Sequence, residues 1–134
     1  MKKLIAELDR VFSIYTRLRY ADKNGIVKCV TCGQPDHWKF MDCGHFVSRH
    51  NQSTRWDEIN CQPQCKICNQ AKGGKPKEFE DYLVEKYGRD EVECLKGRGH
   101  STSKLFQWEI ENYITVYKNR ITGLKVLQSA KACP

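Results

Sequence analysis

Two pairs of cysteines are the residues of this chain whose spacing most clearly indicates chemistry. Cys29 and Cys32 form one Cys-x-x-Cys motif, and Cys65 and Cys68 form a second one a few tens of residues later. Four thiolates at about 2.3 Å in a tetrahedron suit Zn²⁺, and such a site is structural because no coordination position remains for a substrate. We therefore expect these four cysteines to bind one zinc ion. The alternative is a redox-active or disulfide-bonded set.

Four of the eight cysteines lie outside these two motifs. If the segments that carry Cys43 and Cys61 pair as strands, the two side chains are neighbours in the core. They are then either ordinary buried thiols or members of a second or shared metal site. Cys94 and Cys133 are most simply a packing residue on a helix and a residue of the tail.

A histidine and two asparagines surround the second cysteine motif. His45 ends a short apolar-rich segment, Asn60 follows about fifteen residues later, and Asn69 comes directly after Cys68. This order predicts a strand with a histidine, a loop, a strand with an asparagine, and a helix with a third polar residue. We expect a ββα unit whose ends are held together by the zinc ion.

These motifs resemble a known family. The order of Asn60, the cysteine motif, Asn69 and Lys72 is similar to the second half of the HNH endonucleases of the His-metal-finger group. The segments LRYADKNGIVKCVTCG, MDCGHFVSRHNQSTRWDEINCQPQC and CNQAKGG more closely resemble the NinG (Rap) recombination proteins of lambdoid phages. The resemblance extends over residues 8 to 88.

The resemblance implies a role for each of the three polar residues. His45 would be the general base, because an imidazole with a pKa of about 6.5 can accept a proton from water at neutral pH. Asn60 would orient that imidazole or brace the loop. Asn69 would bind a catalytic Mg²⁺ or Mn²⁺ through its amide oxygen, since these ions prefer oxygen ligands and retain several waters.

One position departs from the wider HNH pattern. Members commonly carry Asp or His directly before the catalytic histidine as a further metal ligand, whereas this chain has Gly44. Asp42 is the nearest carboxylate. It is either the missing metal ligand, or a residue that caps a turn or binds a nearby arginine.

Basic residues flank the expected site, and the whole chain is basic, with 23 Lys and Arg against 16 Asp and Glu and a net charge of +7. This balance favours a polyanionic partner, which we expect to be DNA. The alternative is an ordinary solvated surface. The candidate phosphate contacts are Arg49, His50, Arg55, Lys66, Lys72, Lys75 and Lys77.

The elements that must position these residues follow from the apolar pattern. Residues 3–20 and about 103–130 show helical periodicity, and two shorter helices are expected from Pro76 to Gly88 and over RDEVECLKG. The apolar stripe of the last helix is first of all a packing face, which we expect to contact the helix of residues 3–20. Its members are Phe106, Ile110, Tyr113, Tyr117, Ile121, Leu124 and Leu127. The fold class is α+β, with a zinc-clamped, HNH-like ββα-metal core between an N-terminal and a long C-terminal helix. We expect one domain over 1–134, with the N-terminal helix in 1–25, the nuclease core in 26–75 and a helical extension in 76–134.

The function expected from this pattern is that of a divalent-metal-dependent DNA endonuclease. The NinG resemblance implies branched substrates, such as Holliday junctions or D-loops, in phage or prophage recombination. The alternatives are a catalytically inactive zinc-stabilised DNA-binding accessory module and a thiol-redox protein. The exposed remainder of the last helix suggests a homodimer, and recombination proteins are further expected partners. No apolar run could span a membrane, and Glu7 and Asp9 interrupt the N-terminal segment, so we expect a cytoplasmic protein in the bacterial host.

Overall fold

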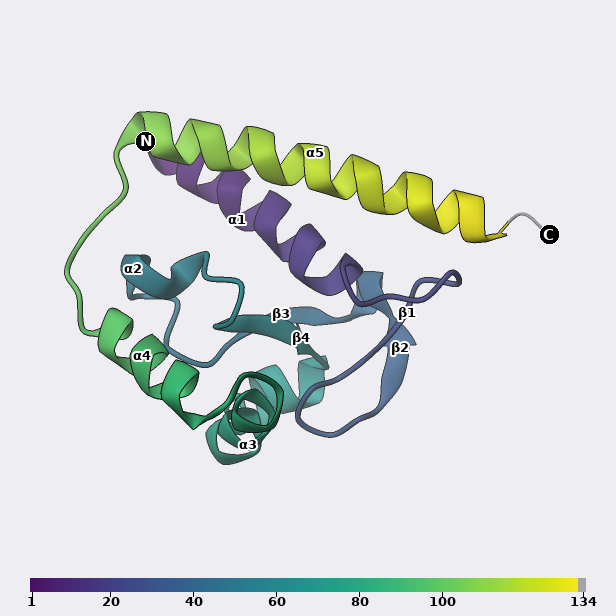
Figure 1. Cartoon of the computed structure of the whole chain (residues 1–134), viewed down its shortest axis with the longest axis horizontal. Coiled ribbons are helices and arrows are strands. Elements are labelled where there is room, and N and C mark those ends of the chain that lie inside the picture. The colour runs from purple at the N-terminus through teal and green to yellow at the C-terminus, as the bar shows by residue number, and fades with distance from the viewer. Residues whose placement is uncertain (133–134) are drawn as a thin grey trace.

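The computed structural model describes residues 1–132, and side chains up to residue 129, so the expectation for Cys133 lies outside the described part. Helices and two small sheets are mixed, which confirms the α+β class. Figure 1 shows a hairpin between two groups of helices, with α1 and α5 on one side and α3 and α4 on the other. No helix among residues 1–132 has both the length and the apolar character that a membrane span requires.

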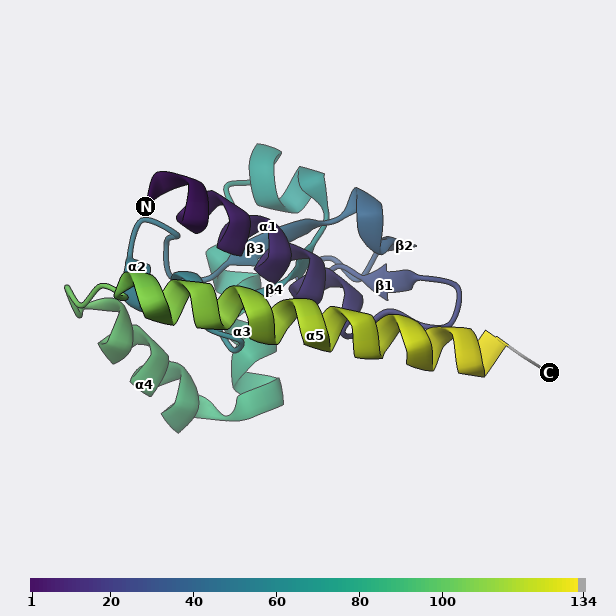
Figure 2. The same cartoon turned by 90° about the horizontal axis from the view of Figure 1, so that it is seen from above.

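Helix α1 (Lys2–Leu18) packs along α5 (Gln107–Ala132), as the views in Figures 1 and 2 both show. Their shared core contains Leu8, Phe12, Ile110 and Tyr117, all 6% exposed or less. Burial of a large apolar side chain stabilises a fold by about 1.5–3 kcal/mol. The predicted contact between the first and last helices is therefore confirmed.

The apolar stripe of α5 differs in part from the predicted one. The helix starts at Gln107 rather than near Ser103. Ile114, which was not among the expected positions, is buried, whereas Phe106 and Leu127 are 68% and 57% exposed. Helix α1 is shorter than α5 and covers only part of it, so side chains near either end of α5 remain in solvent.

Two antiparallel hairpins form the middle of the chain. The first pairs β1 (Ile26–Lys28) with β2 (Pro35–His37), and η1 (Trp38–Phe40) follows. The second pairs β3 (Asp42–His45) with β4 (Cys61–Gln64), and α2 (Gln52–Arg55) lies in the connection between these strands. The expected pairing of the segments that carry Cys43 and Cys61 is confirmed, since His45 lies opposite Cys61 and Cys43 opposite Pro63.

The element after β4 is shorter than expected. Instead of a regular helix that carries Asn69, η2 is a five-residue π-helix (Ile67–Ala71). Its backbone closes with a hydrogen bond from the Lys72 amide to the Ile67 carbonyl at 2.9 Å. Single π-helical turns occur where a side chain must be aimed at a site. Here the turn directs Cys68 and Asn69 toward different partners.

Helices α3 (Pro76–Tyr87) and α4 (Arg89–Gly99) agree with the two shorter predicted helices. Proline occupies the first turn of α3, and Gly88 ends that helix with a φ of 92°, a conformation that glycine adopts at little cost. The two helices share a core of Phe79, Leu83, Val92 and Leu95.

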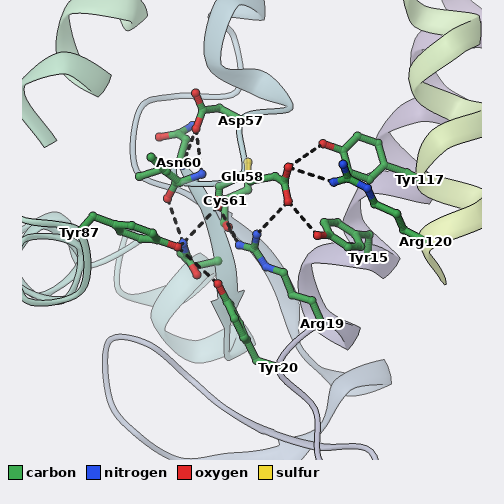
Figure 3. Close-up of polar contacts among 12 residues, drawn as sticks. Tyr15, Arg19, Tyr20, Asp57, Glu58, Asn60, Cys61, Tyr87, Tyr117 and Arg120 are labelled. Carbon is green, nitrogen blue, oxygen red and sulfur yellow. Dashed lines mark hydrogen bonds and ion pairs between the residues drawn. The ribbon is translucent and has the colours of Figure 1, made fainter. Parts of the chain in front are cut away.

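A partly buried polar network fixes the loop before β4 to both long helices (Figure 3). The Glu58 carboxylate accepts hydrogen bonds from Tyr15 Oη at 2.8 Å, Tyr117 Oη at 3.3 Å and Arg120 Nη1 at 3.2 Å. Arg19 Nη2 donates to the carbonyl oxygens of Glu58 and Cys61 at 2.8 and 2.7 Å. These contacts hold β4, and therefore its partner β3, in a fixed position beneath α1.

Candidate metal centres and the adjoining cleft

The four cysteines of the two motifs come together in one cluster. Their sulfur atoms all lie within 4.8 Å of one another, and the sulfurs of Cys32 and Cys65 are 3.8 Å apart. Four sulfurs at about 2.3 Å from one ion would be separated by roughly 3.8 Å in a tetrahedron. The Cys68 amide also donates to the Cys65 sulfur at 3.4 Å. The cluster therefore could hold a structural metal such as zinc, as the spacing predicted.

The electrostatics of the cluster favour a cation. The backbone of Gln34 lowers the pKa of Cys32, but burial and the three neighbouring thiols together raise it by more. The pKa of Cys32 is therefore raised to about 12. Without a positive charge, four thiolates cannot share this volume because each repels the others. A divalent ion removes that repulsion and deprotonates its ligands.

A second possible ligand pair lies beside this cluster, where β3 meets η2. Asn69 Nδ2 donates to an Asp42 carboxylate oxygen at 2.9 Å, and Lys66 Nζ and Gln70 Nε2 each donate to the same carboxylate at 2.8 Å. Burial raises the pKa of Asp42, but these three donors lower it below its ordinary value. Asp42 is therefore a carboxylate at neutral pH. Its partners are Lys66 and two amides. Among the described residues, Asp42 neither caps a turn nor forms a hydrogen bond with an arginine.

Gly44 is required by the packing of the hairpin. A Cβ atom at this position would overlap Oε1 of Gln64 and lie 3.0 Å from its Cβ. Gln64 is fully buried and donates through Nε2 to the Gly74 carbonyl at 2.7 Å, so it cannot easily move. No ligand side chain fits before His45 on this strand. The carboxylate nearest to Asn69 is accordingly that of Asp42.

His45 is held by the backbone of the loop that follows it. Its Nε2 lies 2.9 Å from the Arg55 carbonyl oxygen. A carbonyl only accepts hydrogen bonds, so the neutral ring carries its proton on Nε2, and the lone pair is on Nδ1. Burial lowers the pKa of His45 below its ordinary value, and the hydrogen bond to Arg55 opposes this effect only in part. The imidazole is therefore neutral at neutral pH.

Asn60 braces the loop and does not contact the imidazole. It is fully buried, and its Oδ1 accepts from the Val47 amide at 2.6 Å. Its Nδ2 donates to the carbonyl oxygens of Val47 and Thr54, both at 3.0 Å. These bonds join the two ends of the segment that supplies the Arg55 carbonyl to His45. Of the two roles considered for Asn60, the contacts match the bracing role.

The expected phosphate-contacting residues fall into two groups. Arg55 is bound to Asp9, through Nε at 2.9 Å and Nη2 at 2.6 Å, and Arg49 donates to the same carboxylate at 3.1 Å. Asp9 lies on α1, and no sequence signal pointed to it. Lys66 is engaged by Asp42, as described above. The side chains of His50, Lys72 and Lys77 are exposed, while Lys75 is partly buried with a φ of 46°.

A cleft of about 570 Å³ joins these features. Asp42 and His45 stand on opposite faces of β3, because strand side chains alternate, yet both line this cleft together with Asn69. With Asp42 included, five basic and two acidic side chains line the cleft, which favours an anionic ligand. The charged residues are Asp9, Arg17, Lys39, Asp42, Arg49, Arg55 and Lys66.

Comparison with known proteins gives a consistent result. A family model described as "Bacteriophage Lambda NinG protein" matches residues 1–127. Proteins named "Protein ninG" from Escherichia phage 933W and Salmonella phage P22 are 25% and 27% identical over 105 residues. Each alignment covers 78% of this chain, and it covers 50% of the 933W protein and 49% of the P22 protein. The "Protein ninG" of Escherichia phage lambda is 25% identical over 78% of this chain and 49% of its own length. The chain thus spans about half the length of these relatives. No solved structure matches it.

Proposed function

This chain belongs to the NinG family, and we propose that it is a divalent-metal-dependent DNA endonuclease of the HNH type. The observation that supports this proposal is that three candidate side chains, those of Asp42, His45 and Asn69, line one basic cleft. His45 offers a neutral imidazole whose lone pair is on Nδ1, and Asp42 offers a carboxylate that Asn69 contacts through Nδ2 at 2.9 Å. Asp42 and Asn69 both carry oxygens that can bind a cation. Phosphodiester hydrolysis requires a base for water and a cation against the phosphate, and this arrangement can supply both.

His45 acts as the base in this proposal. Its Nδ1 accepts a proton from water, and the Arg55 carbonyl, through Nε2–H, stabilises the imidazolium that forms. Because burial lowers the pKa of His45, the base stays unprotonated below the ordinary range of histidine. The cleavage rate should rise with pH through this lowered pKa and level off above it. A rate that still rose steeply above the ordinary histidine range would contradict this assignment.

Asp42 and Asn69 would hold Mg²⁺ or Mn²⁺. Both ions prefer oxygen ligands and keep several waters, so one carboxylate and one amide oxygen suffice. When bound, the ion would polarise the scissile phosphate and stabilise the leaving oxygen. Asn69 must then turn its amide oxygen toward the ion, and Lys66 and Gln70 must yield part of the Asp42 carboxylate. The side-chain amide of Asn69 can make that turn by rotation alone.

The remaining basic residues would bind the DNA backbone. His50, Lys72 and Lys77 have the access to solvent that phosphate contacts need, and Lys75 lies between the two lysines in the chain. Arg55, by contrast, is fixed by Asp9, so its role is to hold the carbonyl that orients His45. Phosphate contacts give affinity without base specificity, so binding should weaken strongly with salt.

The branched substrate is inferred from the NinG resemblance. On that basis we assign the chain to phage or prophage recombination in the host cytoplasm, with branched DNA, such as a Holliday junction or D-loop, as its substrate. A homodimer through the exposed part of α5 would present two sites to two strands, and recombination proteins would be further partners.

One observation favours a second candidate function, that of a catalytically inactive DNA-binding accessory module. All the donors around Asp42 come from this chain, namely Lys66, Asn69 and Gln70, and they satisfy the carboxylate without a cation. Such a module would bind DNA equally well with and without Mg²⁺ or Mn²⁺.

The test is cleavage of a labelled four-way junction and a matched linear duplex with Mg²⁺, Mn²⁺ or EDTA. The native chain is compared with His45→Ala and Asp42→Asn, and with Cys94→Ala as a control on the exposed side of α4. Each protein is first shown to hold at least one equivalent of zinc, as expected of the four-cysteine cluster. Loss of one general base typically lowers a rate by about 10²–10⁴-fold. Cation-dependent cutting that survives in Cys94→Ala and is lost in the other two variants supports the nuclease.

Tight binding without cutting under every cation would overturn the nuclease in favour of the accessory module. Equal cutting of junction and duplex would leave the chemistry in place and remove the branched-DNA assignment.

A further inference from the structure

His45 belongs to a second cluster of soft ligands, on the face of β3 opposite Asp42. One ligand atom from each of Cys43, His45 and Cys61 lies within 4.8 Å of the other two. The strand register explains this proximity. Cys43 and His45 are two residues apart on one strand, so they share a face, and Cys61 lies directly opposite His45.

The cluster has a further possible ligand and an access route. The Arg55 carbonyl oxygen lies 2.9 Å from His45 Nε2 and 3.3 Å from the Cys61 sulfur. If the ring proton moves from Nε2 to Nδ1, this oxygen and Nε2 could join the two sulfurs in a coordination shell of two sulfurs, one nitrogen and one oxygen. Cys43 and His45 line the cleft, whereas Cys61 is fully buried beneath α1. An ion could thus enter from the cleft and meet ligands that the core holds in place.

We propose that Cys43, His45 and Cys61 form a second metal site, specific for thiophilic divalent ions such as Zn²⁺, which blocks His45 when it is occupied. Two thiolates and an imidazole suit such ions and not Mg²⁺, which requires oxygen ligands. Binding at this site converts two thiols to thiolates, so two protons are released for each ion that enters. The charge of the ion is then balanced by the two sulfurs.

The functional consequence follows from the chemistry of imidazole. A ring nitrogen bound to a cation has no lone pair for a proton, and the other nitrogen then carries the ring proton, so neither nitrogen can accept a proton from water. This consequence rests on the proposed nuclease function, whereas the binding itself does not. Zn²⁺ would therefore stabilise the protein at the four-cysteine cluster and inhibit it at the second site, while Mg²⁺ or Mn²⁺ at Asp42 and Asn69 supported the reaction.

The first experiment measures metal binding alone. The native chain, kept reduced with a phosphine, is titrated with Zn²⁺ and with Cd²⁺, and the bound equivalents, the thiolate-to-metal absorption and the released protons are recorded. The variants are Cys43→Ala and, as a matched control, Cys94→Ala, because Cys94 is exposed on α4 and belongs to neither cluster. We expect two equivalents in the native chain and in Cys94→Ala, with the second weakened by at least about 10-fold in Cys43→Ala.

A second measurement needs no variant. Alkylation of the native chain, followed by mass spectrometry, reports whether Cys43 is protected when the second equivalent binds. Only one equivalent at any concentration, or a second equivalent that leaves Cys43 as reactive as before, would overturn the proposal.

The inhibition arm separates the two proposals. Cleavage with Mg²⁺ is measured with and without excess Zn²⁺, and the ratio is compared between native, Cys94→Ala and Cys43→Ala proteins. Inhibition of at least about 10-fold in the first two that is relieved in the third supports the blocked base. If the native chain never cuts DNA, the nuclease proposal is overturned, but the binding measurements still test the proposal of a second metal site. If it cuts and Zn²⁺ inhibits all three proteins equally, the second site fails while the nuclease stands.

Discussion

The four-cysteine cluster and the cleft beside it are built in different ways. The cluster takes four identical ligands from two short motifs, and its sulfurs all lie within 4.8 Å of one another, with one pair at 3.8 Å. The cleft takes unlike side chains from α1, β3, the loop after it and η2, and it is open to solvent. A closed set of soft ligands stabilises a fold, whereas an open set of mixed ligands can bind and transform a substrate. The difference predicts separate effects on stability and on activity.

The largest effect is expected from breaking the cluster. Cys68→Ser removes one of its two most buried ligands and should cost several kcal/mol of unfolding free energy, part of the roughly 10–16 kcal/mol that structural zinc supplies. Thermal unfolding and zinc content measure this effect, with Cys94→Ser as the control. An unchanged melting temperature after complete zinc loss would show that the cluster is not structural.

The two asparagines sharpen the comparison, because one belongs to the framework and the other to the site. Asn60→Ala should lower the unfolding free energy by upward of about 3 kcal/mol, since three backbone groups each lose a partner at about 1–3 kcal/mol. Asn69 makes a partly exposed contact, so Asn69→Ala should change the unfolding free energy by no more than about 1 kcal/mol. The same substitution should abolish cation-dependent cutting. Denaturant unfolding of both variants checks this order. Equal losses of stability would remove the distinction.

Gly44 tests whether the hairpin tolerates a ligand before His45. Gly44→Ala should cost about 1–3 kcal/mol because its Cβ meets the buried Gln64 side chain. Gly97→Ala is the matched control, since no atom lies within 4 Å of a Cβ there and alanine favours its helix. Chemical denaturation should therefore show a loss of unfolding free energy for Gly44→Ala and a small gain for Gly97→Ala. A neutral Gly44→Ala would mean that Gln64 can move and that the position is free for a ligand.

The smallest effect on stability is expected at the rim of the cleft. Arg49 is 57% exposed in its ion pair with Asp9, so Arg49→Ala should change the unfolding free energy by no more than about 1 kcal/mol. If Arg49 contacts phosphate, Arg49→Ala should reduce the slope of log DNA affinity against log salt concentration by about one in magnitude. Binding titrations at several salt concentrations measure this slope. An unchanged slope would assign Arg49 to the Asp9 ion pair alone.

Much of the framework could be predicted from the sequence, but little of the site's connectivity could. The helices followed from apolar periodicity, and Pro76 and Gly88 correctly bounded α3. The stripe of α5 was partly wrong because periodicity does not say how far a partner helix extends along it. Asp9 and Glu58 were missed because each meets its partners across forty or more residues, and no local pattern marks such a contact.

What the sequence determined by itself is each half of the cysteine cluster, since a Cys-x-x-Cys motif fixes its own geometry within a single turn. What only the tertiary structure decided is the environment of β3. The strand register sets Cys43 and His45 on one face and Asp42 on the other, and the packing of Gln64 excludes a side chain at Gly44. The loop braced by Asn60 then supplies the carbonyl that orients His45. These relations depend on which elements pack together, and that choice is made by the whole core rather than by any one segment.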